Sequence, residues 1–261
     1  MLQQTQVTRV VERYQRFLEL WPRPADLAAV PLADLLVFWQ GLGYPRRARN
    51  LHGAAAAVVA DHFGQIPRDL DKLLALPGVG PYTAGAVLVF AYEDDIGVVD
   101  TNVGRLLARW AGRSLAISEA QSLADSMVPC GRAWQWNQGL FDLAVTVCRK
   151  RDPRCGECPV APWCQWHTDG GVGPDPAVGS ASVSKRQARF EGSDRQYRGR
   201  ILSAIGTLPR DADELANEVG LAGELDRVIR LLNDLEREGL VWSEVVTSRT
   251  PVWRLGSSVR P

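Results

Sequence analysis

The sequence lacks several features that would assign it to a class directly. It has no apolar run of the roughly 18 residues that a membrane-spanning helix needs, and no signal-peptide pattern opens the chain. It also lacks an excess of charge of either sign, because 30 basic residues balance 30 acidic residues. We therefore expect a soluble cytoplasmic protein without a membrane partner, and net charge alone does not indicate nucleic-acid binding.

Cysteine is scarce too, yet four of the five cysteines lie close together. They follow the pattern C-x6-C-x2-C-x5-C at Cys148, Cys155, Cys158 and Cys164. Thiolates select zinc, Cu(I) or iron–sulfur clusters, and sets of four cysteines hold both structural zinc and 4Fe–4S centres. The spacing leaves both open, but its asymmetry favours a cluster, since a zinc ribbon pairs two C-x2-C knuckles. The odd count argues against disulfides, and we expect Cys130 to be a buried free thiol.

Charge is distributed unevenly along the chain. Basic residues gather at 46–49, 105–113, 149–154 and 185–200, and acidic residues gather between Asp211 and Glu238. A neutral total can therefore conceal a basic face that contacts nucleic acid, although a solvated surface is the ordinary meaning of a single charged run. The acidic residues argue against a DNA-binding surface on the C-terminal part of the chain.

Helical periodicity dominates the sequence before the cysteines. Apolar residues recur at helical spacing in residues 7–20, 27–41, 51–63, 82–92, 101–111, 117–128 and 134–148. No alternating strand pattern appears before residue 240. Residues 168–184 are rich in Gly, Ser and Pro, which is typical of a linker. Beyond it, helices at about 195–207, 211–220 and 224–239 and a hairpin at 240–255 predict a winged-helix domain.

A glycine-rich turn, Leu76–Gly80, lies between two of these helices. Glycine lets the backbone adopt positive φ and approach a partner closely, and the next helix begins with N–H groups that can hold a phosphate. This is the arrangement of a helix-hairpin-helix DNA clamp, although an ordinary helical corner also uses glycine. Asp100 follows 20 residues after Gly80 at the start of another helix, where it is either an N-cap or a catalytic carboxylate.

Several motifs occur in a fixed order along the chain. They are MLQQTQV at 1–7, GLGYPRRARNL at 41–51, LPGVGPYTAGAV at 76–87, VVDTNVGRLLAR at 98–109, NQGLFDL at 137–143 and the four cysteines. Together they resemble the A/G-specific adenine DNA glycosylases of the MutY type, in the helix-hairpin-helix superfamily that also contains endonuclease III. The resemblance covers roughly residues 1–167.

The resemblance implies a mainly α fold. Two helical lobes form a helix-hairpin-helix DNA glycosylase, with an iron–sulfur cluster loop and a small winged-helix-like domain after them. We expect the glycosylase domain at 1–147, the cluster loop at 148–167, the linker at 168–184 and the winged-helix-like domain at 185–261.

The implied activity is base excision repair by a monofunctional glycosylase. The enzyme would hydrolyse the N-glycosidic bond of adenine mispaired with 8-oxoguanine or guanine, after the base leaves the duplex. Asp100 would stabilise positive charge on the sugar, and Asn102 and Tyr82 would line its pocket. Endonuclease III has its lyase lysine where Tyr82 stands. The four cysteines would hold a 4Fe–4S cluster, and the partner would be mismatched double-stranded DNA, bound by a monomer at the bacterial nucleoid.

The resemblance also assigns contacts with DNA. Two glutamines and a tyrosine would wedge into the base stack beside the mismatch, the glycine-rich turn would hold phosphates, and arginines after the first cysteine would face the DNA backbone. The full set is Gln3, Gln4, Thr5, Tyr44, Arg46, Leu76, Gly78, Val79, Gly80, Arg149 and Arg151. Taken singly, glutamines in a first helical turn are usually solvated, and a tyrosine beside a glycine usually packs in a turn.

Two departures from the family keep alternatives open. The family's general acid is a Glu two residues before the Met of MLQQTQV, so it would precede Met1, and we expect an N-terminally truncated sequence. Residues 185–261 do not resemble the Nudix-like domain that helps many members to recognise 8-oxoguanine, and their partner is unknown. The alternatives are a mismatch thymine or uracil glycosylase of the same superfamily and a non-catalytic paralogue that binds mismatched or abasic DNA.

Overall fold

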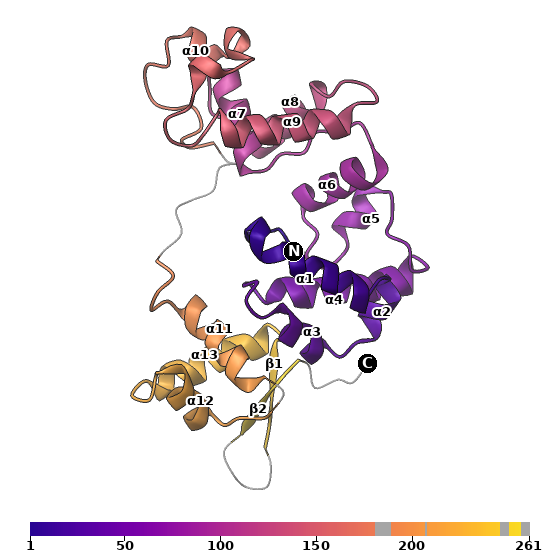
Figure 1. The fold of residues 1–261 in the computed structure, drawn as a ribbon, viewed down its shortest axis with the longest axis vertical. Helices are drawn as coiled ribbons and strands as arrows, with labels where there is room; N and C mark the ends of the chain where they lie inside the picture. Colours follow the sequence, from indigo (N-terminus) through magenta and orange to yellow (C-terminus); the bar gives the residue numbers. More distant parts are fainter. Residues whose placement is uncertain (181–188, 207, 246–250, 257–261) are drawn as a thin grey trace. The chain divides into compact units, whose positions relative to one another are not determined.

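The structure, a computed structural model, describes residues 1–180, 189–206, 208–245 and 251–256. Its regular structure is almost entirely helical, with one two-stranded sheet near the C-terminus (Figure 1). Contacts divide the chain into two units. Unit 1 comprises Met1–Pro67, Leu76–Gly78 and Ala188–Pro261, and unit 2 comprises Arg68–Ala75 and Val79–Gln187. The mainly α fold that the sequence predicts is confirmed.

The N-terminal part of unit 1 is built from short helices. They are α1 (Val7–Leu20), α2 (Pro24–Ala29), α3 (Leu32–Trp39) and α4 (Arg46–Asp61). The single helix predicted at 27–41 is wrong, because Val30 and Pro31 are extended, with ψ of 142° and 134°. Proline disfavours the helical conformation in the residue before it, so the chain must leave the helix at Val30.

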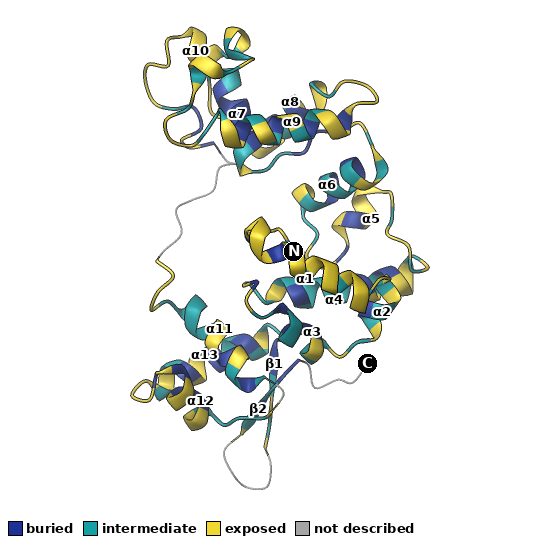
Figure 2. Ribbon diagram, viewed as in Figure 1, coloured by how far each residue is buried: buried dark blue, intermediate teal, exposed yellow. Residues whose placement is uncertain are grey.

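α1 forms at the predicted residues, but most of its apolar face is not buried. Val10 belongs to the core of unit 1. Val7, Val11 and Tyr14 are exposed, so much of α1 lies on the surface (Figure 2). The periodicity therefore identifies the helix without identifying which residues reach the core.

The C-terminal part of unit 1 has the element order of a winged helix. α11 (Asp194–Ile205), α12 (Ala212–Val219) and α13 (Leu225–Arg237) precede the antiparallel strands β1 (Val241–Glu244) and β2 (Val252–Leu255). Val241 pairs with Leu255, and Glu244 pairs with Val252. The predicted helices and hairpin strands are confirmed, while residues 246–250 of the predicted hairpin lie outside the described residues.

One apolar core joins the N-terminal and C-terminal segments of unit 1. Leu35 of α3 lies in the same buried cluster as Ile201 of α11 and Leu231 of α13. A polar contact supports this packing, because the guanidinium of Arg49 in α4 donates a hydrogen bond to the carbonyl oxygen of Glu238. The C-terminal helices therefore support the helices that carry the first two sequence motifs.

Unit 2 contains the other helices. They are α5 (Leu70–Leu74), α6 (Pro81–Tyr92), α7 (Thr101–Ala111), α8 (Ile117–Ser126), α9 (Ala133–Thr146) and α10 (Gln165–Thr168), with 3-10 turns at Cys155–Glu157 and Ala161–Trp163. α7 is the central helix, because residues Val103 to Arg109 are all buried (Figure 2) and its apolar side chains share a core with α8 and α9. Within the described ranges of both units, no helix is long and apolar enough to cross a membrane.

Candidate active site

The glycine-rich turn joins α5 to α6 and makes a helix-hairpin-helix. Leu76 is buried, and Val79 is half-buried. Gly78 has a φ of 76°, and a Cβ atom there would lie 2.6 Å from the Cβ of Asn50, so the turn requires glycine at this position. Gly80 is the N-cap of α6 and provides no capping side chain. The predicted clamp residues therefore form one turn ahead of a helix N-terminus, which favours an anion.

Asp100 is the N-cap of α7. Its Oδ1 atom accepts hydrogen bonds from the backbone N of Asn102 at 2.8 Å and of Val103 at 2.7 Å. Its Oδ2 atom accepts a hydrogen bond from the side-chain Nδ2 of Asn102 at 2.9 Å. These donors at the helix N-terminus hold the carboxylate in a fixed orientation. The same hydrogen bonds thus make Asp100 the N-cap of α7 and hold its carboxylate in one orientation.

Arg105 connects this carboxylate to the first cysteine. It lies one helical turn after Asn102 and is only 5% exposed. Its Nη1 donates to Oδ1 of Asn102 at 3.1 Å, while Nε donates to the carbonyl oxygen of Cys148 at 3.0 Å and Nη2 to that of Ala144 at 2.6 Å. The sequence motifs did not single out Arg105 as a site residue. Its spacing of i+3 from Asn102 was a signal that could have found it.

Tyr82, in the first turn of α6, is electrostatically coupled to Asp100. Burial, and then the negative charge of Asp100, raise the pKa of the Tyr82 phenol above its ordinary value. The phenol therefore stays protonated at neutral pH, and the side chain has no amine that could form a Schiff base. The structure thus brings the three predicted catalytic residues, Asp100, Asn102 and Tyr82, into one part of unit 2.

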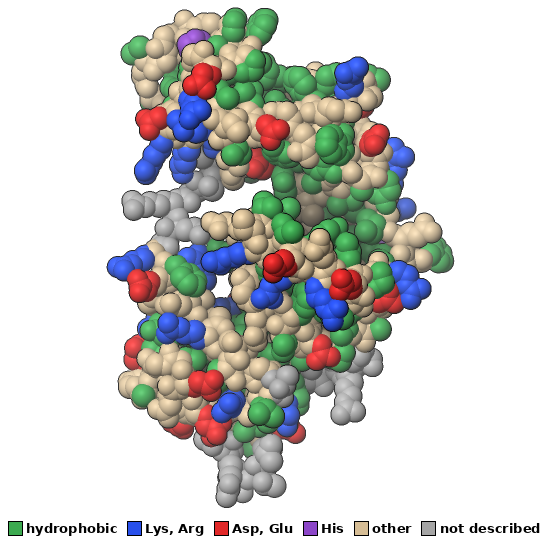
Figure 3. Space-filling model, viewed as in Figure 1, with side chains coloured by type: hydrophobic (Ala, Val, Ile, Leu, Met, Phe, Trp, Pro, Cys, Tyr) green, Lys and Arg blue, Asp and Glu red, His purple; other side chains and the backbone are tan. Residues whose placement is uncertain are grey.

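A polar pocket of about 280 Å³ lies beside the start of α7. It is lined by Thr101, Asn102, Arg105, Ala144, Val145, Arg149 and Lys150. Positive charge therefore lines a cavity next to the residue that fixes Asp100. Arg151 is exposed on the same loop but does not line this pocket. In Figure 3, several Lys and Arg side chains lie close together on the surface of unit 2 near the loops around α10.

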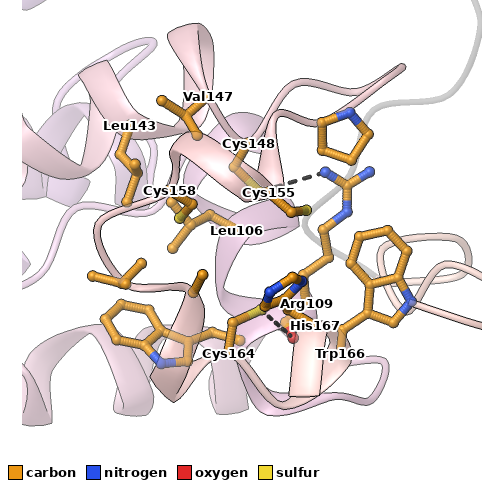
Figure 4. A pocket seen from close by; sticks show the side chains of 14 residues that line it. Leu106, Arg109, Leu143, Val147, Cys148, Cys155, Cys158, Cys164, Trp166 and His167 are labelled. Atoms are coloured by element: carbon orange, nitrogen blue, oxygen red, sulfur yellow. Dashed lines mark hydrogen bonds between the residues drawn. The ribbon is translucent and has the colours of Figure 1, made fainter. Parts of the chain in front are cut away.

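The four predicted metal-ligating cysteines line a second, mostly apolar pocket (Figure 4). Leu106 of α7, Leu143 of α9 and Val147 contribute to its wall. Cys130 is exposed and lies elsewhere, so the expectation that it is buried is wrong. The four clustered thiols therefore line one pocket, and Cys130 does not line it.

Arg109 is a buried cation beside these thiols and is 2% exposed. Its Nη1 lies 3.4 Å from the Sγ of Cys148, and the thiol of Cys164 donates to the Arg109 carbonyl oxygen at 3.4 Å (Figure 4). Asp175 accepts hydrogen bonds from the Arg109 guanidinium at 2.6 and 3.0 Å, and the Trp166 ring lies 4.9 Å away. Sequence reasoning missed Arg109 and Asp175 because their partners are distant along the chain.

Four thiols around one pocket are the donor set of either a structural zinc ion or a 4Fe–4S cluster. Among the described residues, no group of three or more His, Cys, Asp or Glu side chains is arranged so that it could already hold a metal ion. Burial and the neighbouring thiols Cys148 and Cys158 raise the pKa of Cys155. Metal ions bound between the sulfurs would instead lower the pKa of these thiols, since bound metal favours the thiolate form.

In unit 1, Arg47 joins the two segments predicted to wedge into DNA. Its guanidinium donates hydrogen bonds to the carbonyl oxygens of Met1, Gln3, Leu42 and Gly43 and to the Oγ1 of Thr5. Thr5 also donates from Oγ1 to the Leu42 carbonyl oxygen at 2.9 Å. The motif at 1–7 and the motif at 41–51 are therefore held together by the half-buried Arg47. In the sequence, Arg47 was noted only as part of a basic run.

Two of the predicted wedge residues have unusual backbones. Gln4 has a φ of 56° and Tyr44 a φ of 49°, a left-handed conformation that side chains other than glycine seldom adopt. Such strain persists where surrounding contacts enforce it and is frequent at functional sites. Gln3 and Gln4 are exposed, and Tyr44 is half-buried. Arg46 is exposed, with its Nε 3.9 Å from a carboxylate oxygen of Glu238.

Comparison with known proteins assigns the family. The model of the HhH-GPD superfamily of base excision DNA repair proteins matches residues 1–130. The chain is 38% identical over 247 residues to the adenine DNA glycosylase of Mycolicibacterium smegmatis, covering 92% of this chain and 81% of that one. It is 41% identical over 212 residues to the adenine DNA glycosylase of Mycobacterium tuberculosis, covering 78% and 67%.

Solved structures agree with these relatives at the level of the fold. A thermostable thymine-DNA glycosylase is 28% identical with a TM-score of 0.60, over 64% of this chain and 80% of that chain. A trapped covalent intermediate of endonuclease III with DNA, in an estranged-adenine complex, is 27% identical with a TM-score of 0.58, over 65% and 81%. The chain therefore belongs to the HhH-GPD superfamily of base excision DNA repair proteins and, within it, to the adenine DNA glycosylase family.

Proposed function

We propose that this protein is a monofunctional adenine DNA glycosylase. It acts as a monomer on double-stranded DNA and removes adenine mispaired with 8-oxoguanine or guanine. The observation that carries the proposal is the Asp100 carboxylate, which is fixed at the N-terminus of α7 by two backbone N–H groups and the side chain of Asn102. The cytoplasm, at the chromosomal DNA, is the compartment that this substrate requires.

Glycosidic cleavage needs an anion that is already in place. As the bond between C1′ of the deoxyribose and N9 of adenine breaks, the bonding electrons leave with the base and the sugar becomes positively charged. Ionised Asp100 stabilises this charge without reorganising, because its hydrogen bonds already exist. A water molecule then adds to C1′ and loses a proton, while the departing adenine gains one. Tyr82, a phenol rather than an amine, cannot form the imine on which β-elimination depends.

DNA binding uses elements from both units. The turn Leu76–Gly80 and the N-terminus of α6 take a phosphate, and in unit 2 Arg149 and Lys150 take another beside the polar pocket. In unit 1, the residues around Gln3, Gln4 and Tyr44 enter the stack at the mismatch, where unpairing costs least. The positive φ angles of Gln4 and Tyr44 support this assignment, because strained backbone is frequent at functional sites.

Cys148, Cys155, Cys158 and Cys164 hold a 4Fe–4S cluster. When bound, the cluster would cross-link residues 148–164 and so fix the loop that carries Arg149. Arg109 balances the thiolates from one side. Through Arg105, which bonds to both Asn102 and the Cys148 carbonyl oxygen, the cluster loop also steadies the catalytic carboxylate.

A mismatch thymine glycosylase is the second candidate. The thymine-DNA glycosylase structure favours it, at 28% identity. The adenine enzymes are more similar, at 38% and 41%, and a matched set of duplexes with adenine, thymine or uracil opposite guanine separates the two activities. Release of adenine alone supports the proposal, and preferential release of thymine or uracil supports the second candidate.

The proposal is tested by Asp100→Asn. Asparagine caps a helix about as well as aspartate, so the thermal transition and the affinity for mismatched DNA should change little. The single-turnover rate of adenine release should fall by at least about 10²-fold. Asp142→Asn, at an exposed position of α9, is the control for loss of one negative charge. Excision by Asp100→Asn at the wild-type rate would overturn the assignment, and a wild-type protein that binds without excising would overturn the function.

A further inference from the structure

Two guanidinium groups lie close to the ring of Tyr44. Arg47, three residues later, is 5.8 Å from the centre of the Tyr44 ring. Arg195, 151 residues away in the sequence, is 5.9 Å from the same ring. The Nη1 atom of Arg195 also donates a hydrogen bond to the Tyr44 hydroxyl at 3.1 Å. The ring and the hydroxyl of one predicted wedge residue are therefore both contacted by the C-terminal part of the chain.

The Arg195 side chain is supplied by a helix that is itself fixed. α11 begins with the N-cap Ser193, and its first residue, Asp194, accepts hydrogen bonds from Arg227 and Arg230 of α13. Further along α11, Arg198 donates to the Glu238 carboxylate at 2.6 Å. Because α11 is tied at two points to α13 and its C-cap residue, the position of Arg195 is determined by the packing of the C-terminal helices.

The acidic residues between Asp211 and Glu238 do not exclude a position of the C-terminal helices beside DNA. Glu238 is engaged by Arg198 and Arg46, and Glu214 forms a capping box with Asp211 at the start of α12. Several of the negative charges that argued against DNA contact are thus used inside unit 1. The guanidinium of Arg195, on α11, lies over the ring of Tyr44 and 5.0 Å from the centre of the Phe190 ring.

We propose that Arg195 is a positioning residue for Tyr44, so that the winged-helix-like domain takes part in discriminating the base opposite the adenine. The inference rests on the proposed function, which places Tyr44 at the mismatch. Tyr44 has a left-handed backbone, and Arg195 holds its hydroxyl while Arg47 holds the backbone around Gly43. The domain would thus act on recognition through a residue of the glycosylase motif rather than through a pocket of its own.

The test compares Arg195→Gln with Arg189→Gln. Arg189 precedes α11, is highly exposed and pairs with Glu191, so its loss removes the same charge without touching Tyr44. The readout is the ratio of dissociation constants for two uncut duplexes, which carry a tetrahydrofuran abasic analogue opposite 8-oxoguanine or guanine. Arg195→Gln should reduce the wild-type ratio about fivefold, the equivalent of one hydrogen bond, while Arg189→Gln leaves the ratio unchanged.

A double-mutant cycle with Tyr44→Phe shows whether Arg195 acts through the hydroxyl. In the Tyr44→Phe background, Arg195→Gln should change the ratio less than it does in the wild type. Arg195→Lys, which keeps the charge but loses the planar fork, should resemble Arg195→Gln. Thermal transitions measured for each variant separate lost recognition from lost folding, because α11 does not depend on Arg195 for its contacts with α13.

Each outcome decides the inference. An unchanged ratio in Arg195→Gln, an equal loss in Arg189→Gln, or additive effects in the double mutant would overturn it. A wild-type protein that binds both duplexes equally would also overturn it, because there would be no discrimination to position. A wild-type protein that discriminates between the duplexes but releases no adenine would refute the proposed function, and the ratio in Arg195→Gln would still decide the inference.

Discussion

Asp100 uses its two carboxylate oxygens differently. Oδ1 accepts from backbone N–H groups of α7, and Oδ2 faces the side chain of Asn102. The capping role explains why the chain can keep an anion at a half-buried position, since a helix N-terminus stabilises negative charge. The proposed catalytic role would need no further rearrangement of the helix, so folding and the proposed catalysis favour the same residue.

The cysteine pocket gives a prediction with an internal control. Cys158→Ser should lose iron and inorganic sulfide, because serine replaces one of the thiols that line the pocket. It should also lower the thermal transition of the purified protein, since bound metal contributes to folding free energy. Cys130→Ser should keep full iron content, because Cys130 is exposed and lies outside the pocket. Equal iron content in both variants would contradict the assignment.

The sequence could predict candidate ligands and a candidate catalytic carboxylate, but not the residues that contact them. Four closely spaced cysteines and an aspartate at a helix start are local patterns. Arg109 and Asp175 are 66 residues apart, and Arg105 and Cys148 are 43 apart. Such partners are set by how α7 packs against the loops, which no local pattern reports. A buried arginine within a basic run is indistinguishable in sequence from a solvated one.

At the scale of secondary structure, the helix-hairpin-helix depends on one glycine more than the other. Gly78→Ala would place a methyl group at a φ of 76° and against Asn50. The left-handed conformation alone costs about 1–2 kcal/mol, so the thermal transition and the affinity for DNA should both fall. Gly80→Ala is the control, because a Cβ at Gly80 would meet nothing within 4 Å. Comparable DNA dissociation constants for the two variants would contradict the special role of Gly78.

The contact between α11 and α13 should depend on pH. The hydrogen bond from Arg227 is the largest influence on Asp194, and together with Arg230 it lowers the pKa of Asp194 despite partial burial. A lowered pKa means that the stabilisation is present above the unfolded value of about 4 and is lost as pH falls through the folded value.

Asp194→Asn should therefore lower the thermal transition at pH 6 but have little effect near pH 3. The difference in unfolding free energy at pH 6 should not exceed about 1 kcal/mol, because Asp194 is partly exposed and solvent screens such pairs. Asp226→Asn, at an exposed position of α13, serves as the control. Melting curves followed by circular dichroism measure both variants, and an equal shift at both pH values would contradict the prediction.

Element prediction from the sequence succeeded where periodic segments were long. The helices at 7–20, 82–92 and 101–111 match α1, α6 and α7 closely. α5 was not predicted, because five residues give too short a window for a helical period. The break between α2 and α3 came from a single proline, whose effect on the preceding residue outweighed a continuous apolar pattern.

At the scale of the whole molecule, chain order and spatial grouping differ. Composition marks residues 168–184 as a linker, and that boundary stays a prediction. The described part of this segment contacts α7 and the loop after it, since Asp175 binds Arg109 and Ser180 accepts from the backbone N of Leu115 at 3.1 Å. Contacts also group the C-terminal helices with α1 to α4 rather than with the elements that precede them. Pairing of segments so distant in sequence cannot be inferred from periodicity or composition.

The shared core of unit 1 makes a prediction about the whole chain. If residues 181–188 are replaced by a specific protease site and the chain is cut there, the C-terminal fragment should stay bound, because Ile201 and Leu231 share a buried cluster with Leu35. The fragments should elute together in size-exclusion chromatography. Arg49→Glu should weaken the association, since it removes the bond to the Glu238 carbonyl oxygen and adds a second negative charge there. Separate elution of the wild-type fragments would mean that the common core does not hold unit 1 together.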